Sequence, residues 1–217
     1  MTSAQAARRA IRDGRHTGST RGLAPGYLQC NLVVLNRSLA YDFLVYCQRN
    51  PKACPALEVT DPGDPEPRLL APGADLRTDL PRYAVYRQGR RENDRTDIRE
   101  LWTPDSVAVL IGSGMTWDPA LERAGVPTDR YRWVLRTALP TLPAGPCHGP
   151  LVVTMRWLTP AQALAAIRIS GRFPRTHGAP IPIGDPAAIG AALTDPLVGG
   201  PVPDRPLVTA FQTYSGG

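Results

Sequence analysis

Residues 174–190 read Pro-Arg-Thr-His-Gly-Ala-Pro-Ile-Pro-Ile-Gly-Asp-Pro-Ala-Ala-Ile-Gly and contain one of only three histidines in the chain, His177. Asp185 is a favourable N-cap, and Pro186 suits the first turn of a helix. Gly184 allows the backbone to approach a neighbouring group closely. We therefore expect a rigid loop that opens a short helix, with free N–H groups suited to a carboxylate or phosphate. The alternative is a well-capped helix after a turn, with His177 in a structural role.

Strand-like and helix-like patterns alternate along the rest of the chain. Apolar and alternating runs predict strands at 27–35, 57–60, 107–111, 133–138, 151–158 and 206–214. Capping and breaking residues predict helices at 4–13, 39–49, 119–124 and 160–169, the last opened by a capping box at Thr159 and Gln162. A hairpin is expected around Gln88-Gly89. This alternation predicts an α/β fold with a mixed sheet and packed helices.

The composition is that of a globular chain. Its 217 residues are enough for one large domain or two small ones, and a 42% hydrophobic content supports a core. No apolar run reaches the ~18 residues that a membrane span needs, and the N-terminus lacks the apolar segment of a signal peptide. We therefore expect a cytoplasmic protein with no membrane partner. The four cysteines, at positions 30, 47, 54 and 147, form no CxxC pair, so we expect reduced thiols and no disulfide.

The formal net charge of +6 comes from 24 arginines and a single lysine, Lys52. Pyridoxal chemistry needs a Schiff-base lysine, and the one lysine lies in a loop-like context beside Pro51, so we exclude this class. Nucleic-acid binding favours clustered basic residues with interleaved aromatics. Here the arginines are scattered and aromatics are only 6%, so we expect no nucleic-acid partner. Arginine more often binds carboxylates through its two-pronged guanidinium, which favours a small carboxylate ligand.

Two groups of polar side chains are candidates for a site. Gln29 and Asn31 alternate with apolar residues in the 27–35 strand, so both amides share one face and bind either a substrate or a neighbouring loop. The loop 71–81 presents Asp75, Arg77 and Asp79 at two-residue spacing. This set is either an acid/base or substrate-orienting group, or an internal ion-pair brace.

A further loop reads Gly-Ser-Gly-Met-Thr-Trp-Asp at 112–118, after the apolar run 107–111 and before a helix start. It is a second candidate site at the start of a helix and contains Ser113 and Thr116. Ser113 does not satisfy GxSxG, so a serine hydrolase is a minor alternative. The chain has no GxGxxG in a strand–helix context, no P-loop and no zinc-like histidine spacing. We expect neither a metal nor an organic cofactor.

Several separated runs cover nearly the whole chain in one order. They include Gly-Leu-Ala-Pro-Gly-Tyr-Leu-Gln-Cys-Asn-Leu-Val-Val-Leu at 22–35, Ala-Asp-Leu-Arg-Thr-Asp-Leu-Pro-Arg-Tyr at 74–83 and Gly-Pro-Leu-Val-Val-Thr-Met-Arg at 149–156, with shorter matches at 40–44, 50–55, 144–145, 177–180 and 183–190. Together they resemble the hydro-lyase family that includes the D-glutamate cyclases. The resemblance implies one family unit, 1–217, with an α/β fold of two intimately packed lobes. We place these lobes at 1–95 with 175–217 and at 96–174. The activity it implies is closure of D-glutamate to 5-oxoproline with loss of water.

The chain also departs from that family pattern. The family usually has a cysteine at Ser113, a glutamate at Asp118, an asparagine at Ala138 and a second histidine at Pro182. It has a Cys-Gly pair near 211–212 and then continues through a further histidine-containing segment. The departures imply a diverged, C-terminally shortened member with an altered substrate and a role in specialised biosynthesis. The alternative is a non-catalytic binding or scaffold protein that retains the family fold.

Lactam closure needs a clamp for the non-reacting carboxylate, a base for the amine and donors for the oxyanion. We assign the clamp to Arg136 or Arg156. His177 is the first candidate for the proton carrier, because its ordinary pKa lies near neutrality. Asp75 and Asp79 either orient His177 or replace it.

Other candidates complete this predicted site. The Asn31 amide and the N–H groups after Gly184 are candidates for stabilising the oxyanion. The predicted substrate-binding residues are Arg136, Arg156, Gln29, Ser113, Thr116, Gly184 and Asp185. We also expect self-association as a homodimer, because two-fold dimers are the commonest oligomers.

Overall fold

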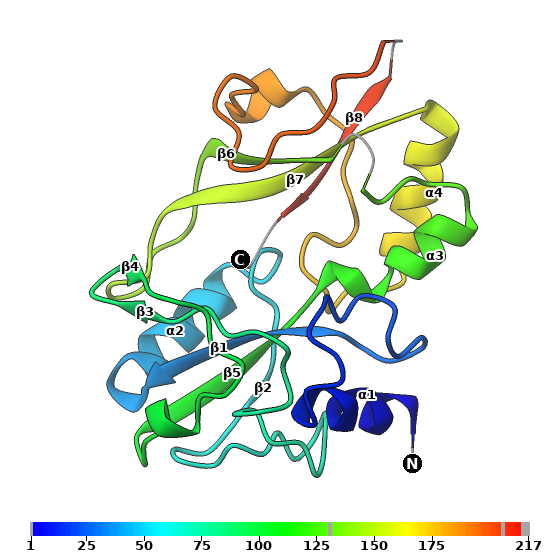
Figure 1. Cartoon of the computed structure of the whole chain (residues 1–217). Helices are drawn as coiled ribbons and strands as arrows, with labels where there is room; N and C mark the ends of the chain where they lie inside the picture. The colour runs from blue at the N-terminus through cyan, green and yellow to red at the C-terminus, as the bar shows by residue number, and fades with distance from the viewer. Residues whose placement is uncertain (1, 130–131, 205–206, 214–217) are drawn as a thin grey trace. The chain divides into compact units, whose positions relative to one another are not determined.

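The computed structural model describes residues 2–129, 132–204 and 207–213 (Figure 1). The chain divides into two compact units, each built from several segments. The first unit is Met1–Tyr27, Leu32–Ala40 and Glu58–Leu110, and the second is Leu28–Asn31, Tyr41–Leu57 and Ile111–Gly217. The lobes expected from the sequence have other bounds, 1–95 with 175–217 and 96–174, and they stay a prediction.

A three-stranded sheet has the order β1-β5-β2. Its strands are β1 (Cys30–Asn36), β5 (Ser106–Gly112) and β2 (Ala56–Val59), and α2 (Arg37–Arg49) follows β1 directly. All seven residues of β5 are buried, and β5 lies between the other two strands. A nearly continuous apolar run suits a strand buried on both faces, which is why the sequence 107–111 predicted this element.

A second, antiparallel sheet has the order β6-β7-β8 and lies in the second unit. Its strands are β6 (Arg132–Pro140), β7 (Pro150–Leu158) and β8 (Val208–Thr213). Successive side chains point to opposite faces of a strand. Val153, Met155 and Phe211 therefore share one face, where they form a core with residues after η3 (Pro186–Ile189). The other face carries Arg156 and Gln212.

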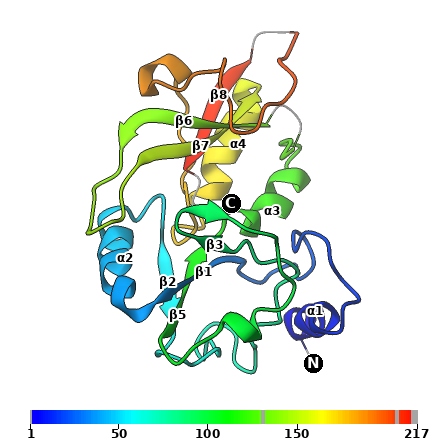
Figure 2. The same ribbon diagram turned by 60° about the vertical axis from the view of Figure 1, so that its left-hand side comes forward.

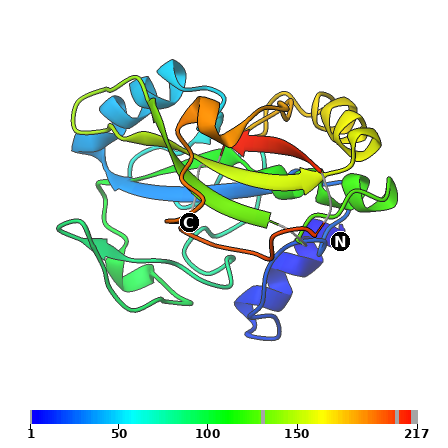
Figure 3. The same ribbon diagram turned by 90° about the horizontal axis from the view of Figure 1, so that it is seen from above.

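α4 (Pro160–Ser170) packs on β7 and β8 and next to α3 (Asp118–Arg123). It runs behind these strands in Figure 2, and Figure 3 shows it in yellow beside β8 in red. The predicted capping box is confirmed, since Thr159 accepts from the backbone of Gln162 and the Gln162 side chain accepts from the Thr159 N–H. A buried cluster of Trp117, Leu121, Ala163, Ala166, Leu158 and Ala210 fills the space between helices and sheet.

The helix α3 and the element after Asp185 differ from expectation. The N-cap of α3 is Trp117, after the short turn η2 (Gly114–Thr116), and Asp118 is already the first residue of the helix. The sequence had Asp118 as the cap, one residue too late. The element after Asp185 is the four-residue 3₁₀ turn η3, which Gly190 ends in a left-handed conformation. Asp185 does cap it, with its carboxylate accepting from Ala187 N–H at 2.9 Å.

The first unit contains α1 (Ser3–Arg12), the hairpin β3 (Tyr86–Arg87) and β4 (Arg90–Arg91), and the 3₁₀ turn η1 (Arg99–Leu101). Gln88 and Gly89 form the hairpin turn with φ of 49° and 75°, which confirms the predicted turn. The α/β class is confirmed, although the described strands form two three-stranded sheets and a hairpin instead of one mixed sheet. No helix among the described residues is long and apolar enough to cross a membrane.

Candidate active site

The loop that carries His177 is tied to two neighbouring segments of the second unit. The His177 N–H donates to the Gly112 carbonyl at 2.8 Å, and the Gly178 N–H donates to the Lys52 carbonyl at 2.7 Å. The Lys52 ammonium in turn donates to the Ala179 carbonyl. The structure buries His177 to 4% exposure. Close backbone pairing on both sides of the loop accounts for this burial.

The end of β5 packs against this loop without room for side chains. A Cβ atom added to Gly112 would lie 1.9 Å from the Arg175 carbonyl oxygen. One added to Gly114 would lie 1.9 Å from Nε2 of Gln212 and 3.1 Å from the Trp117 ring. Packing against the backbone therefore requires glycine at position 112, whereas a side chain at position 114 would have to displace the Gln212 amide.

The imidazole of His177 is held in its neutral form. Its Nε2 accepts the Gly114 N–H at 3.3 Å, so the ring proton is assigned to Nδ1. Burial, together with the charge of Arg156, lowers the pKa of His177 to about 4. At neutral pH this region therefore contains a neutral imidazole beside a cation.

Arg156 and Arg136, the two candidate carboxylate clamps, have different environments. Arg156 on β7 is 5% exposed, and its Nη1 donates to Oε1 of Gln212 at 2.9 Å. Arg136 on β6 is exposed. Only Arg156 is among the charges that act on His177. The structure thus separates two residues that the sequence left equivalent.

Three further predicted residues lie around Gly114. The Ser113 N–H donates to the Gln29 carbonyl at 2.9 Å, and the Gln29 N–H donates to Oγ1 of Thr116 at 3.0 Å. The Ser113 hydroxyl is buried and accepts the Met115 N–H at 3.4 Å. Gln29, Ser113 and Thr116 therefore come together at the turn that contacts His177. Asn31 is half-buried in β1.

Gly184 and Asp185 are exposed and engaged in local hydrogen bonds. The Gly184 N–H donates to the Thr209 carbonyl at 3.2 Å, and the Thr209 hydroxyl donates to the Gly184 carbonyl. Asp185 caps η3. The Gly184 N–H is thus bonded to β8 and the Ala187 N–H to the Asp185 cap, while the role of this segment in an oxyanion site stays a prediction.

Asp75 and Asp79 lie in the first unit, where both are paired with arginines. Asp79 accepts two bonds of 2.7 Å from the Arg12 guanidinium and one of 3.0 Å from the Asp75 N–H. Asp75 accepts from Arg77 Nε at 2.8 Å and Nη2 at 2.9 Å. Hydrogen bonding from Arg77 lowers the pKa of Asp75. These contacts describe an ion-pair brace, while a catalytic role for either carboxylate stays a prediction.

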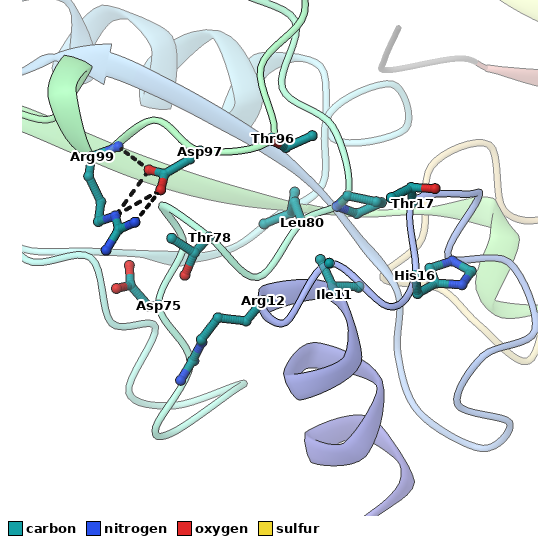
Figure 4. A pocket seen from close by; sticks show the side chains of 12 residues that line it. Ile11, Arg12, His16, Thr17, Asp75, Thr78, Leu80, Thr96, Asp97 and Arg99 are labelled. Carbon is teal, nitrogen blue, oxygen red and sulfur yellow. Dashed lines mark hydrogen bonds and ion pairs between the residues drawn. The ribbon is translucent and has the colours of Figure 1, made fainter.

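A cavity of about 450 Å³ opens beside Asp75 in the first unit (Figure 4). We call it the Asp75 cavity. Its lining combines charged groups with hydroxyl groups, and it includes Arg12, Arg99, Asp97, Thr17, Thr78 and Thr96. Asp97 is bound by both ends of the Arg99 guanidinium, as the dashed lines in Figure 4 show. The charges around this cavity are therefore largely balanced by one another.

Sequence reasoning missed Gln212, which contacts both Arg156 and the Gly114 position. Its strand was predicted, but the pairing of β8 with β7 is a long-range feature. Alternation within β8 already places Gln212 and Phe211 on opposite faces. Among the described residues, no group of three histidine, cysteine, aspartate or glutamate side chains is arranged to hold a metal ion.

Comparison with known proteins identifies the family. The profile of D-glutamate cyclase matches residues 107–206. A protein of Stutzerimonas stutzeri named "Putative hydro-lyase" is 47% identical over 205 residues, which cover 92% of this chain and 77% of the relative. A protein of the same name from Jannaschia sp. is 47% identical over 209 residues, covering 94% of this chain and 79% of the relative. The chain therefore belongs to the family of the D-glutamate cyclases and of these hydro-lyase relatives.

Proposed function

We propose that the protein is a lyase- or cyclase-type enzyme that acts on a small molecule bearing a carboxylate, by ring closure or by elimination of water. The D-glutamate cyclase profile and the relatives named as hydro-lyases support this reaction class. The observation that carries the proposal is the pairing of a buried cation, Arg156, with a buried neutral imidazole, His177. An apolar core alone would not require either group.

In this mechanism Arg156 binds the non-reacting carboxylate of the substrate through its guanidinium. For ring closure, His177 Nε2 accepts a proton from the substrate ammonium, and the amine nitrogen then forms a bond to the distal carboxyl carbon. The C–O bond breaks, and the oxygen leaves as water. Both hydrogens of that water come from the ammonium group, so His177 returns what it accepts and ends the cycle neutral.

Gly114 has a second role in this mechanism. Its N–H now points at His177 Nε2 at 3.3 Å, which is long for a hydrogen bond. When Nε2 takes up a proton, this N–H loses its acceptor and becomes a donor for the oxyanion that develops nearby. Asn31, Asp75 and Asp79 stay predicted contributors to the same chemistry.

We further propose that the substrate is not D-glutamate but a bulkier carboxylate or acyl intermediate. Ser113, where the family usually has a cysteine, adjoins the Gly114 turn, and Gln212 lies where a family glycine is expected. Phe211 does not support the altered pocket, because it projects into the core on the sheet face opposite Arg156. Trp157 gives no support either, because it packs edge-on against Trp133 on the same sheet face as Phe211.

The alternative is a non-catalytic binding protein that keeps the family fold. One observation favours it: the Nε2 lone pair of His177 already accepts the Gly114 N–H in a buried setting. In that case Arg156 retains a ligand carboxylate without any proton transfer. The predicted homodimer also stays part of the proposal, and light scattering at tens of micromolar protein tests it.

The test is incubation of purified protein with D-glutamate and with a panel of amino diacids and short acyl compounds, following loss of water by mass spectrometry. With an active substrate, His177→Asn should lower turnover by roughly 10² or more. Arg156→Met should chiefly raise KM, whereas its matched control, Arg136→Met, should leave KM unchanged. Binding in a thermal-shift assay without turnover would favour the alternative. D-glutamate turnover near one per second, ordinary for an enzyme, would refute the altered substrate.

A further inference from the structure

Gln212 occupies a buried position on β8 next to the pair Arg156 and His177. It is 4% exposed and lies opposite Thr154 of β7, so it is the diagonal cross-strand neighbour of Arg156. Diagonal neighbours on the same face of an antiparallel pair are within reach of long side chains. The register of β8 therefore brings the Gln212 amide to the Arg156 guanidinium.

The two ends of this amide contact two different parts of the site. Oε1 accepts from Arg156 Nη1 at 2.9 Å. The nitrogen end fills the space that a side chain at position 114 would need, 1.9 Å from the place of an added Cβ. Gly114 in turn donates its N–H to His177. The Gln212 side chain thus contacts Arg156 and the Gly114 position directly, and it is linked to His177 through Gly114.

We propose that Gln212 is a positioning residue, whose amide holds Arg156 beside His177 and keeps the Gly114 turn against the imidazole. Its importance for the reaction rests on the proposed function, but the positioning itself does not. An amide accepts the guanidinium bond without neutralising the charge, and the Arg156 charge lowers the pKa of His177. A carboxylate at the same position would satisfy the guanidinium and cancel that effect.

Arg156 on β7 is the charge that lowers the pKa of His177. Two other cations belong to segments at this loop: Lys52, whose ammonium binds the Ala179 carbonyl, and Arg175, two residues before His177. A change at position 212 acts on Arg156 and leaves Lys52 and Arg175 in place. The protonation of His177 therefore reports on the link between Gln212 and Arg156.

The experiment is NMR titration of the imidazole signals of Gln212→Glu. The chain has only three histidines, so His177→Asn assigns the signal. His177 should titrate at about 4 in the parent protein, and Gln212→Glu should raise its pKa by about one pH unit or more. The matched control is Gln162→Glu, the same chemical change on α4 of the same unit, which should leave the His177 signal unchanged.

A second variant covers the case in which Gln212→Glu does not fold. Gln212→Met is close in size and removes the bond to Arg156 without adding charge, so the guanidinium is released and the pKa of His177 should rise, though less. A folded Gln212→Glu or Gln212→Met protein whose His177 titrates as in the parent would overturn the proposal.

The result also separates this inference from the proposed function. If the His177 pKa moves as expected but no compound on the panel is turned over, Gln212 is a positioning residue in a protein without the proposed activity. If a substrate is turned over, Gln212→Met should raise KM about tenfold or more, with a smaller change in kcat. If the Gln212→Met variant keeps the parent turnover and the parent pKa of His177, the inference is refuted and the proposed function still stands.

Discussion

His177 in the second unit lies buried beside Arg156, whereas Asp75 in the first unit is partly open to solvent beside Arg77. Both residues have a lowered pKa, but for different reasons. Burial is the larger cause for His177, and a hydrogen bond from an arginine is the larger cause for Asp75. The first group is held neutral near a cation, and the second is held charged by one.

This difference separates a candidate active site from a structural brace. Around the Asp75 cavity each described carboxylate of the Asp75–Arg77, Asp79–Arg12 and Asp97–Arg99 pairs is matched by a guanidinium. Near His177, the cation Arg156 donates to an uncharged amide, that of Gln212. A hydrogen bond to an amide leaves the guanidinium charged, and such a group can bind a substrate carboxylate.

The largest effect is expected from adding one methyl group behind His177. Gly112→Ala would place Cβ 1.9 Å from the Arg175 carbonyl oxygen, where the backbone cannot yield without moving the His177 loop. We expect a loss of more than about 3 kcal/mol in the free energy of unfolding, measured by urea denaturation.

Two glycine variants serve as controls for that steric argument. Gly184→Ala meets only Phe211 at 3.5 Å and should change stability by less than about 0.5 kcal/mol. Gly73→Ala in the first unit meets no atom within 4 Å but has φ of +75°, so it should cost about 1–2 kcal/mol from backbone strain alone. Similar losses at Gly112 and Gly73 would show that the His177 loop is not rigidly packed.

Acid titration should distinguish the two regions by their pH windows. The unfolded chain protonates His177 near pH 6.5, but the folded chain does so only near pH 4, so the unfolded state binds more protons between these values. Stability is therefore complete above pH 6.5 and should fall by about 3 kcal/mol down to pH 4. His177→Asn should remove this slope, as followed by urea denaturation at a series of pH values.

Asp75 should act in a lower window. Its folded pKa lies below its ordinary value of 3.8, so its contribution to stability is present above that value and is lost only as the pH falls further. Asp75→Asn should therefore leave the slope between pH 6.5 and pH 4 intact. An unchanged slope in His177→Asn would mean that the imidazole is solvated in the folded protein.

Sequence reasoning succeeded where the signal is local. The capping box at Thr159, the turn at Gln88-Gly89 and the apolar strand 107–111 each depend on a few adjacent residues. Reasoning failed at Asp118, because the η2 turn starts the helix one residue earlier through contacts of the Gly114 backbone. The family itself was recognisable because its matching runs extend along the whole chain.

The candidate site depended on long-range contacts and was only partly predictable. His177, Arg156 and Ser113 were named from the sequence, but the approach of His177 to the 112–114 turn follows from the long-range bond between the His177 N–H and the Gly112 carbonyl. Gln212 carried no local signal, since its role appears only with the register of β8 on β7. Burial of His177 was equally hidden, because the glycines that allow it are far away in the sequence.

Removing one carboxylate charge from the ion-pair brace should lower the free energy of unfolding by less, and the loss should depend on how buried the carboxylate is. The Asp79 side chain is 2% exposed and accepts bonds from Arg12 and the Asp75 N–H, so Asp79→Asn should lower the free energy of unfolding by roughly 1.5–3 kcal/mol. Asp75 and its partner Arg77 are about 30% exposed, and Asp75→Asn should cost less than about 1 kcal/mol.

The same two variants also test the catalytic prediction for these carboxylates. If Asp75 and Asp79 are only structural, turnover of an identified substrate should fall no further than the folded fraction does. A loss of roughly 10² in kcat for folded Asp75→Asn would instead place it among the proton-transferring groups. The comparison between the two regions would then no longer hold.

Thiol labelling of the four cysteines reports how often the second unit opens, and it needs no substitution that would change stability. Cys47 and Cys54 are buried and form a hydrogen bond in which Cys47 is the donor, and this bond lowers the pKa of Cys54. Cys30 and Cys147 are half-buried. Mass measurement without reductant should find four free thiols, and a thiol-specific reagent followed by peptide mapping should label Cys30 and Cys147 first.

Cys54 adjoins the 50–53 turn that includes Lys52, whose carbonyl and ammonium hold the loop after His177. Labelling of Cys54 therefore requires this part of the molecule to open. The ratio of the Cys54 labelling rate to that of an unprotected thiol is the equilibrium constant of opening, and its logarithm gives the opening free energy. We expect labelling on the order of 10³-fold slower, equivalent to about 4 kcal/mol. Cys54 should react before Cys47, because the donated hydrogen bond favours its thiolate and raises the pKa of Cys47. Fast labelling of both would show that the His177 region is as open as the Asp75 cavity.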